Sequence, residues 1–146
     1  MDKNYQYNNA ELYLEIAGVM FIAIDTDAKI TLVNPKACEI LGYTKEELIG
    51  MDWFDNFIDN INRMEVRGIF EKIINGEIEK VEYFENPIQT KNGERFISWH
   101  NTTIKDNGKI VGILSSGEDI TETKKLKEKT EIQIKISYFT CILCII

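Results

Sequence analysis

The side chains best suited to hold a ligand are an aromatic ring and an amide on one predicted strand. In residues 95–105, alternate side chains point to opposite faces of the strand, so Trp99 and Asn101 share a face with Ile97. A flat ring beside a hydrogen-bonding amide suits a planar ligand or a small organic acid. The alternative is that Trp99 is a core aromatic residue and Asn101 hydrogen-bonds the backbone. The predicted ligand pocket comprises Trp53, Phe57, Phe70, Trp99, Asn101, Ile113 and Ser115.

The other reactive groups form no recognisable catalytic or metal pattern. The single histidine, His100, falls on the strand face opposite Trp99, so a Ser–His–Asp arrangement is not expected. Cys141 and Cys144 have the spacing of half a zinc site, but the second pair of ligands is missing. Residues 112–117 have the glycine spacing of a phosphate loop without its Lys and Ser/Thr. We therefore expect no catalytic residue, no metal site and no enzymatic activity.

Composition and charge narrow the class of protein. The 146 residues, with 44% hydrophobic and 28% charged side chains, fit one globular domain with short extensions. A formal net charge of −7 opposes binding to the phosphate backbone of nucleic acid. Three cysteines and a polar N-terminus without an apolar core segment argue against secretion. We expect a cytoplasmic protein with no nucleic-acid partner.

The first half of the chain predicts a hairpin followed by short helices. Residues 11–16 favour a short amphipathic helix, and residues 20–24 and 30–33 favour two strands joined by a turn. Asn34 followed by Pro35 indicates a helix start, and Gly42 a helix end. Thr44 and Glu47 have the spacing of a capping box. An apolar cluster over 53–58 then predicts one or two helical turns.

The second half predicts one longer helix and three strands. A helix begins near Asn62, because residues 66, 69, 70, 73 and 74 form one apolar face, and it ends at Asn75-Gly76. Asn92-Gly93 and Asn107-Gly108 predict tight hairpin turns in which both residues have positive φ. These turns separate strands over about 81–90, 95–105 and 110–118. The expected fold is α+β, a five-stranded antiparallel sheet with helices on one face.

The composition changes after residue 121. Residues 122–135 are charged and favour a connecting helix, and residues 137–146 are apolar over about half the length that a membrane span needs. We expect no membrane span. The predicted organisation is an N-terminal polar segment with a short helix over 1–18, a domain over 19–121, and a helical linker with an apolar tail over 122–146.

Several short motifs, in this order and spacing, resemble the PAS superfamily, specifically the S-box type that provides sensory input to two-component kinases. They are FIAID (21–25), ITLVN (30–34), ACEILGY (37–43), EELIG (46–50), KNGE (91–94) and, after Gly112, DITE (119–122). The resemblance covers about residues 10–125. It implies a five-stranded sheet that encloses a pocket with its helices, and a hinge at Asp119, Ile120 and Thr121 that joins the sheet to an output helix.

The hinge residues have side chains suited to that role. Thr121 is placed to cap the following helix, and Asp119 to pair with a nearby cation. Two such contacts would make the position of the helix depend on the position of the strand. A plain helix cap is the alternative interpretation, and the two roles are physically compatible.

The sequence does not identify a cofactor. Haem-binding relatives commonly supply an axial histidine from the long helix, and residues 62–75 contain none. Flavin photosensors of the family carry a reactive cysteine after the short helices, where this chain reads WFDNF (53–57). Cys38, on an earlier helix, is interpreted as a small core residue. Haem is therefore disfavoured, and a non-covalent flavin stays open.

Two functions remain as hypotheses at this point. The first is a sensory module that binds a small ligand and couples it to the output helix of a sensor histidine kinase system. The second is a ligand-free dimerisation or interaction scaffold. A cavity of a few hundred Å³ near Trp99 would favour the first. We also expect a homodimer through the N-terminal helix (Leu12, Leu14, Ile16) and the outer sheet face that carries Phe96. Any output domain would lie outside this chain, which is expected to be a fragment or a single-domain protein.

Overall fold

The computed structural model describes residues 3–77 and 83–145, and it confirms the α+β class. The elements in chain order are α1 (Lys3–Ile16), β1 (Met20–Asp25), β2 (Ile30–Val33), α2 (Pro35–Leu41), α3 (Lys45–Leu48), α4 (Trp53–Phe57), α5 (Arg63–Ile74), β3 (Tyr83–Thr90), β4 (Gly93–Asp106), β5 (Lys109–Asp119) and α6 (Thr121–Ile145). The first two residues of the predicted third strand, 81 and 82, lie outside the described residues.

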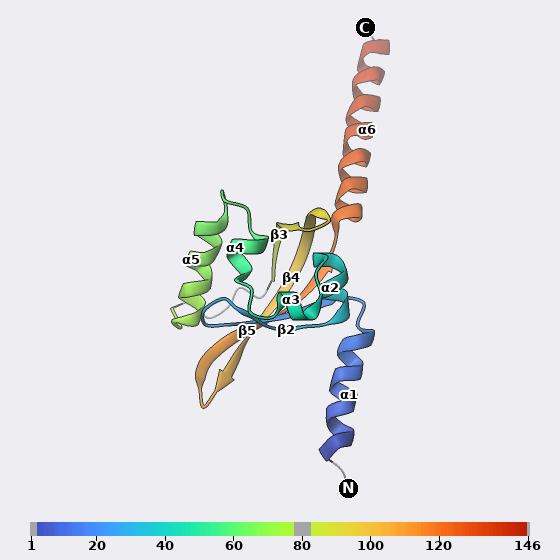
Figure 1. Ribbon diagram of the computed structural model, residues 1–146. Helices are drawn as coiled ribbons and strands as arrows, with labels where there is room; N and C mark the ends of the chain where they lie inside the picture. Colours follow the sequence, from blue (N-terminus) through green and yellow to red (C-terminus); the bar gives the residue numbers. More distant parts are fainter. Residues whose placement is uncertain (1–2, 78–82, 146) are drawn as a thin grey trace.

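The five strands form one antiparallel sheet in the order β2-β1-β5-β4-β3. The last strand of the chain thus pairs with the first, so the N-terminal hairpin and the C-terminal meander become one sheet. Helices α2 to α5 gather on one side of it, while α1 and α6 project away from it in opposite directions (Figure 1).

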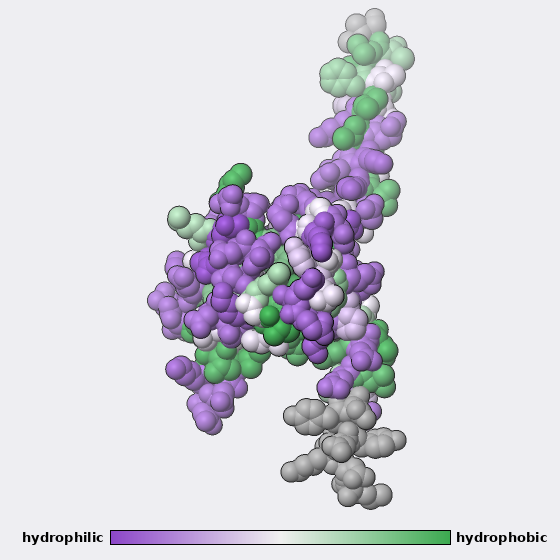
Figure 2. All heavy atoms as spheres, in the orientation of Figure 1, coloured by the Kyte–Doolittle hydropathy of each residue, from purple (hydrophilic) through white to green (hydrophobic). Residues whose placement is uncertain are grey.

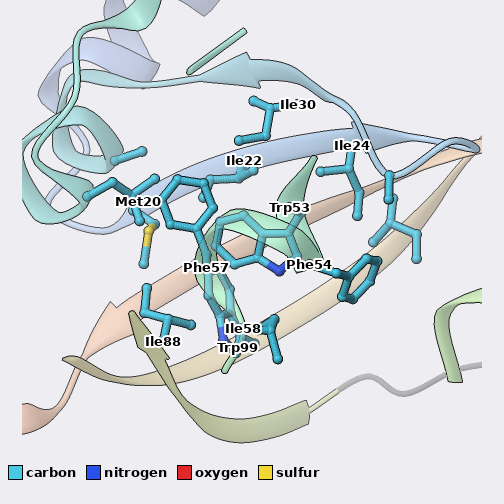
Figure 3. Close-up of a cluster of buried hydrophobic side chains, with 14 of the residues drawn as sticks. Met20, Ile22, Ile24, Ile30, Trp53, Phe54, Phe57, Ile58, Ile88 and Trp99 are labelled. Atoms are coloured by element: carbon cyan, nitrogen blue, oxygen red, sulfur yellow. The ribbon is translucent and has the colours of Figure 1, made fainter. Parts of the chain in front are cut away.

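The inner face of the sheet forms the floor of the hydrophobic core. Directly paired residues point to the same face, and each strand therefore contributes every second residue. The inner-face residues that are buried include Met20, Ile22, Ile24, Ile97, Trp99 and Ile113. Trp53, Phe54, Phe57 and Ile58 cover them from the helical side (Figure 3). The predicted inward orientation of Ile97 and Trp99 is confirmed, and His100 is exposed on the opposite face.

The two Asn-Gly hairpins differ from each other. Asn107 and Gly108 both have positive φ, 49° and 78°, as the sequence predicts. At the other hairpin only Gly93 has positive φ, 100°. Thr90 pairs directly with Gly93, so the turn residues are Lys91 and Asn92. The prediction of positive φ at both Asn92 and Gly93 is therefore wrong, because the turn lies one residue earlier and Gly93 already opens β4.

Asn34 joins three elements through four hydrogen bonds. Its Oδ1 accepts from the backbone N–H of Phe21 at 2.8 Å and of Ala37 at 3.0 Å, which caps α2 as predicted. Its Nδ2 donates to the carbonyls of Leu14 at 3.1 Å and Val19 at 2.9 Å. The side chain is buried, with 2% of the residue exposed. One amide therefore fixes the end of α1, the start of β1 and the start of α2 relative to one another.

The terminal helices differ from their predicted forms. Helix α1 starts at Lys3 rather than near residue 11, and its Leu12 and Ile16 are 49% and 73% exposed. Helix α6 runs unbroken through both the predicted linker and the apolar tail. Its outer half carries hydrophobic residues that stand clear of the domain (Figure 2). None of the helices in the described part of the chain is long and apolar enough to cross a membrane.

Replacing Asn34 by alanine should destabilise the domain by about 3 kcal/mol, because it removes a helix cap and leaves the partly buried Phe21 N–H without its partner. Chemical denaturation, followed by far-ultraviolet circular dichroism, measures the free energy of unfolding. Asn62→Ala is a matched control, since Asn62 precedes α5 but makes no side-chain cap. It should change stability by no more than about 0.5 kcal/mol. Equal effects of the two substitutions would contradict the role given to Asn34.

Candidate functional site

A cavity of about 120 Å³ lies between the inner face of the sheet and helices α4 and α5. The residues around it are largely aliphatic and aromatic, with three polar side chains among them. The described residues that line it are Ile22, Ile24, Trp53, Phe54, Val66, Ile69, Phe70, Ile73, Phe84, Asn86, Trp99, Asn101, Ile113 and Ser115. The cavity is smaller than the few hundred Å³ that the sequence analysis took as the mark of a ligand site.

The polar groups of the cavity are paired with one another across the strands. Asn101 lies directly opposite Ser115, and the Ser115 hydroxyl donates to Asn101 Oδ1 at 2.6 Å. The Trp99 indole N–H donates to Asn86 Oδ1 at 2.8 Å. Within the described residues, no buried side-chain nitrogen or oxygen lacks a hydrogen-bond partner. The Asn101 amide oxygen thus accepts a hydrogen bond from a side chain of the neighbouring strand.

Aromatic rings form the wall nearest to helix α4. The Trp53 and Trp99 rings are 5.6 Å apart between centroids and meet at 89°. Phe54 and Phe70 are 5.2 Å apart between centroids. Phe57 stands behind this wall, 4.9 Å from Trp53 between ring centroids, and it is not among the residues that line the cavity (Figure 3).

Gly117 makes room for Trp99. A Cβ atom at position 117 would lie 2.7 Å from Trp99 Cζ3 and 2.9 Å from both Ile97 Cγ2 and Met20 Cε. Gly117 is the residue directly opposite Trp99 in the sheet. The indole ring can therefore lie flat across β5 only because this position has no side chain.

An ion-pair group outside the cavity holds α5 against α4. Arg67 of α5 donates to Asp52 Oδ1 at 2.9 Å and to Asp55 Oδ1 at 3.2 Å, and its guanidinium lies 5.1 Å from the centroid of the Phe54 ring. Lys29 approaches the other Asp52 oxygen at 3.7 Å. Burial alone would raise the pKa of Asp52, but the Asp55 N–H and the Arg67 guanidinium outweigh it and hold that pKa below its ordinary value.

The structure brings most of the predicted pocket residues to one cavity. Trp53, Phe70, Trp99, Asn101, Ile113 and Ser115 line it, and Phe57 does not. Several other lining residues were not predicted from the sequence. Val66, Ile69 and Ile73 lie on the apolar helix face that the 3.6-residue period already defined, so this signal was available. Phe84 and Asn86 gave no signal, because their inward orientation depends on the register of β3 against β4.

The predicted hinge is built around the Asp119 carboxylate. Arg95 Nε donates to Asp119 Oδ2 at 2.7 Å, which confirms the predicted cation partner. Asp119 Oδ1 accepts from the backbone N–H of Thr121 at 3.0 Å and also from the Thr121 hydroxyl. The Thr121 hydroxyl in turn accepts from the Phe96 N–H at 2.9 Å. Thr121 is therefore not the cap of α6 as predicted. It lies inside the helix, and Asp119 satisfies its N–H.

Two further contacts fasten the start of α6 to β4. The Ile120 N–H donates to the Phe96 carbonyl at 2.9 Å, which extends the pairing of β4 by one residue. The Lys124 ammonium lies 3.2 Å from the centroid of the Phe96 ring, an arrangement that favours the cation. Phe96, on the outer face of β4, thus contacts α6 through its backbone and its ring.

Neighbouring groups stabilise the negative charge of the Asp119 carboxylate. Burial alone would raise its pKa, but hydrogen bonds from Thr121 and Arg95, with the Arg95 charge, outweigh burial and hold the pKa below its ordinary value. The carboxylate is therefore ionised at neutral pH, and its two oxygens serve the strand and the helix separately.

Other reactive groups lie apart from the cavity. Cys38 is half-buried against the core, as predicted, and burial raises the pKa of its thiol. Cys141 and Cys144 are exposed on α6. Among the described residues, no cluster of three or more His, Cys, Asp or Glu side chains could hold a metal ion.

Comparisons with known proteins agree on the type of domain. The sequence profile described as PAS domain matches residues 17–122. Phytochrome B of Oryza sativa subsp. indica is 29% identical over 122 residues, which cover 80% of this chain but only 10% of the phytochrome. The chain therefore spans about a tenth of the length of that relative.

Solved structures share the fold at low sequence identity. A domain of a sensory box sensor histidine kinase/response regulator from Geobacter sulfurreducens has a TM-score of 0.64 at 21% identity, with 81% of this chain and 97% of that chain covered. The PAS domain of the Cronobacter turicensis RpfR quorum-sensing receptor, in complex with BDSF, has a TM-score of 0.59 at 21% identity, with 72% of this chain and 96% of that chain covered.

The stabilising contribution of the Asp119 contacts at the hinge should fall only at acid pH. Asp119 has a lowered pKa in the folded state, so its stabilising contribution is complete above its unfolded pKa of about 4 and is lost as the pH falls through the lower folded pKa. Asp119→Asn should cost about 1–2 kcal/mol at pH 7. This difference should be constant from pH 8 to 5 and should shrink below about pH 4. Free energies of unfolding of both proteins across this range measure it.

Taking the difference between the two proteins removes the contribution of Asp52, whose pKa is also lowered. Glu118→Gln, at an exposed neighbouring position, is the control and should show a small difference at every pH. A cost of Asp119→Asn that is the same at pH 7 and pH 3 would show that the Asp119 charge does not hold the hinge.

Proposed function

Because this chain belongs to the PAS domain family, we propose that it is a sensory module that binds a small ligand in the cavity and couples its occupancy to α6. The continuity of β4 and β5 from the cavity to the hinge carries this proposal. Trp99 and Ser115 line the cavity, and Arg95 and Asp119 lie four residues further along the same strands. Four residues span roughly 13 Å of strand.

The paired strands offer a short mechanical route between the two sites. A ligand that shifts Trp99 or Asn101 acts on the same backbone that holds Arg95 and Phe96, and these two residues hold the start of α6. A ligand can move α6 only if it binds more tightly to one of two arrangements of the hinge. We expect the two arrangements of the hinge to differ in the Asp119 contacts. Asp119 is a charged strand residue whose contacts reach the first turn of α6.

The setting of this module is also a proposal. We place it in a sensor histidine kinase system, since a structural neighbour comes from a sensory box sensor histidine kinase. The chain itself would catalyse nothing, and any kinase activity would belong to an output domain that α6 contacts. We place it in the cytoplasm, since its three cysteines are free thiols.

A second candidate function, a dimerisation scaffold, is favoured by a different observation. Leu12, Tyr13 and Ile16 of α1 are exposed, and so are Tyr83 and Val111 on the sheet. Exposed apolar side chains of this kind are enriched at protein–protein contacts. The small cavity is equally compatible with a scaffold that holds no ligand. The two functions can coexist, because none of these exposed side chains lines the cavity.

Filling the cavity should alter the hinge if the two are coupled. Val66→Phe enlarges a lining residue of α5 far along the chain from α6. We expect hydrogen exchange at the Phe96 and Ile120 amides to change at least threefold, because both amides belong to the hinge. Met64→Phe adds a phenyl ring to the exposed face of the same helix and should leave both amides unchanged.

Adding Asp119→Asn to Val66→Phe should remove the difference, since the route then lacks its last contact. If Val66→Phe folds, fills the cavity and leaves exchange at both amides as in the wild type, coupling from the cavity to α6 is refuted.

The dimer can be tested separately by sedimentation velocity. The chain should sediment as a dimer, and Leu12→Asp combined with Ile16→Asp should convert it to a monomer by placing charges on the exposed face of α1. Ile61→Asp, at a position 91% exposed between α4 and α5, should remain dimeric. A monomeric wild-type chain at tens of micromolar would rule out the scaffold in its homodimeric form.

A further inference from the structure

We propose that the cavity takes a neutral, largely apolar molecule of about the size of benzene, and that it excludes organic acids, flavin and haem. This inference rests on the proposed function, in which the cavity is the ligand site. Three independent properties of the cavity narrow the ligand to this chemical class. They are the cavity volume, the absence of ionisable groups among the described lining residues, and the hydrogen bonds between the polar lining groups.

Size sets the first limit. The cavity volume is about 120 Å³. Sites for drug-sized ligands and cofactors occupy roughly 300–1,000 Å³. The space is therefore smaller than the usual range for such ligands. A cavity of about 150 Å³ engineered in another protein, lined by Leu, Ile and Phe, stays dry and binds benzene or xenon. A flavin ring system or haem would require α5 or the sheet to move.

Charge sets the second limit. None of the described residues that line the cavity is ionisable. A buried carboxylate needs a cation or several aligned donors to offset its desolvation. Arg67 already pairs with Asp52 and Asp55, and Arg95 with Asp119. Arg63 of α5 donates to the backbone carbonyls of Phe54 and Ile58. Among the described residues that line this site, the carboxylate of a small organic acid therefore has no charged partner.

The hydrogen bonds within the lining set the third limit. Ser115 donates to Asn101, and Trp99 donates to Asn86. A polar guest that donated to either amide oxygen, or accepted from Ser115 or Trp99, would have to compete with these bonds. Water in the cavity would face the same competition, and an apolar guest that displaces poorly bound water gains affinity. The lining therefore favours a guest whose affinity comes from apolar contact area and not from hydrogen bonds.

The aromatic wall favours a flat guest among apolar ones. Trp53 and Trp99 meet nearly at right angles, so the cavity has indole groups in two orientations on one side. Aromatic rings pair well both edge to face and offset face to face. A single aromatic ring can make both kinds of contact here, and a chain of the same volume cannot.

The chain carries its own reporter for this test. It contains only two tryptophans, Trp53 and Trp99, and both line the cavity. Tryptophan fluorescence and the midpoint of thermal unfolding should therefore both respond to a guest. We expect benzene to change the fluorescence in a saturable way and to raise the midpoint. Benzoate, which adds a carboxylate to the same ring, should bind at least tenfold more weakly.

Filled cavities should lose the response. Val66→Phe and Ile69→Phe each enlarge a lining residue of α5, and either one that folds should abolish the benzene effect. Met64→Phe, on the exposed face of that helix, should bind benzene as the wild type does. The wild type should also show no visible absorbance from haem or flavin.

Three outcomes overturn the inference. They are no saturable effect of benzene on the wild type, benzoate binding as tightly as benzene, and native mass spectrometry of the purified chain showing a resident charged or cofactor-sized molecule. The last of these would leave the sensory function standing. Conversely, benzene binding with unchanged exchange at the Phe96 and Ile120 amides would support the guest class and refute the coupling.

Discussion

The register of β4 against β5 is the constraint on which both the cavity and the hinge depend. One alignment places Asn101 opposite Ser115, Trp99 opposite Gly117 and Ile97 opposite Asp119. A slip of one residue would turn each of these side chains to the other face of the sheet. The polar pair, the indole ring and the start of the helix linker are therefore set by a single pairing. The close fit of Trp99 over Gly117 supports this register, because any side chain at position 117 would force Trp99, Ile97 or Met20 to shift.

In the part of the chain that the structure describes, charged groups lie around the cavity but do not line it. The Arg67 group holds α5 to the N-terminal end of α4, and the Arg95–Asp119 pair holds α6 to the sheet. Both use arginine, whose planar guanidinium can serve two acceptors or cover an aromatic ring at once. This arrangement separates two physical tasks. Apolar surface inside the cavity sets which guest fits, and the charged contacts outside set how the surrounding elements respond to it.

Helix α6 has a regular backbone, but its apolar side chains are not covered by the rest of the domain. Ile132, Ile134, Ile136 and Tyr138 alternate with polar residues, a two-residue period that is typical of a strand, yet the segment is helical. On a helix this spacing distributes apolar side chains around more than one side, and all four are exposed. A helix with this surface is normally covered by other protein. The proposed contact of α6 with an output domain or a second chain would supply that cover.

By itself, the sequence determined the elements whose signals are local. Asn34 and Pro35 defined the start of α2, the capping box at Thr44 defined α3, and the apolar period of residues 66–74 defined α5 and its inner face. The alternation around Trp99 also gave the correct face of β4. Such signals depend on bonding within a few residues, so they survive without knowledge of the rest of the fold.

Only the tertiary structure decided what meets across strands and layers. The pairing of Asn86 with Trp99, the exclusion of Phe57 from the lining and the transfer of the capping role from Thr121 to Asp119 all depend on distances between segments. The cavity volume does too, because it is the space left after all of these side chains have packed. No local sequence pattern determines the cavity volume. The sequence therefore indicated which residues would face inward but not how large a cavity they would leave.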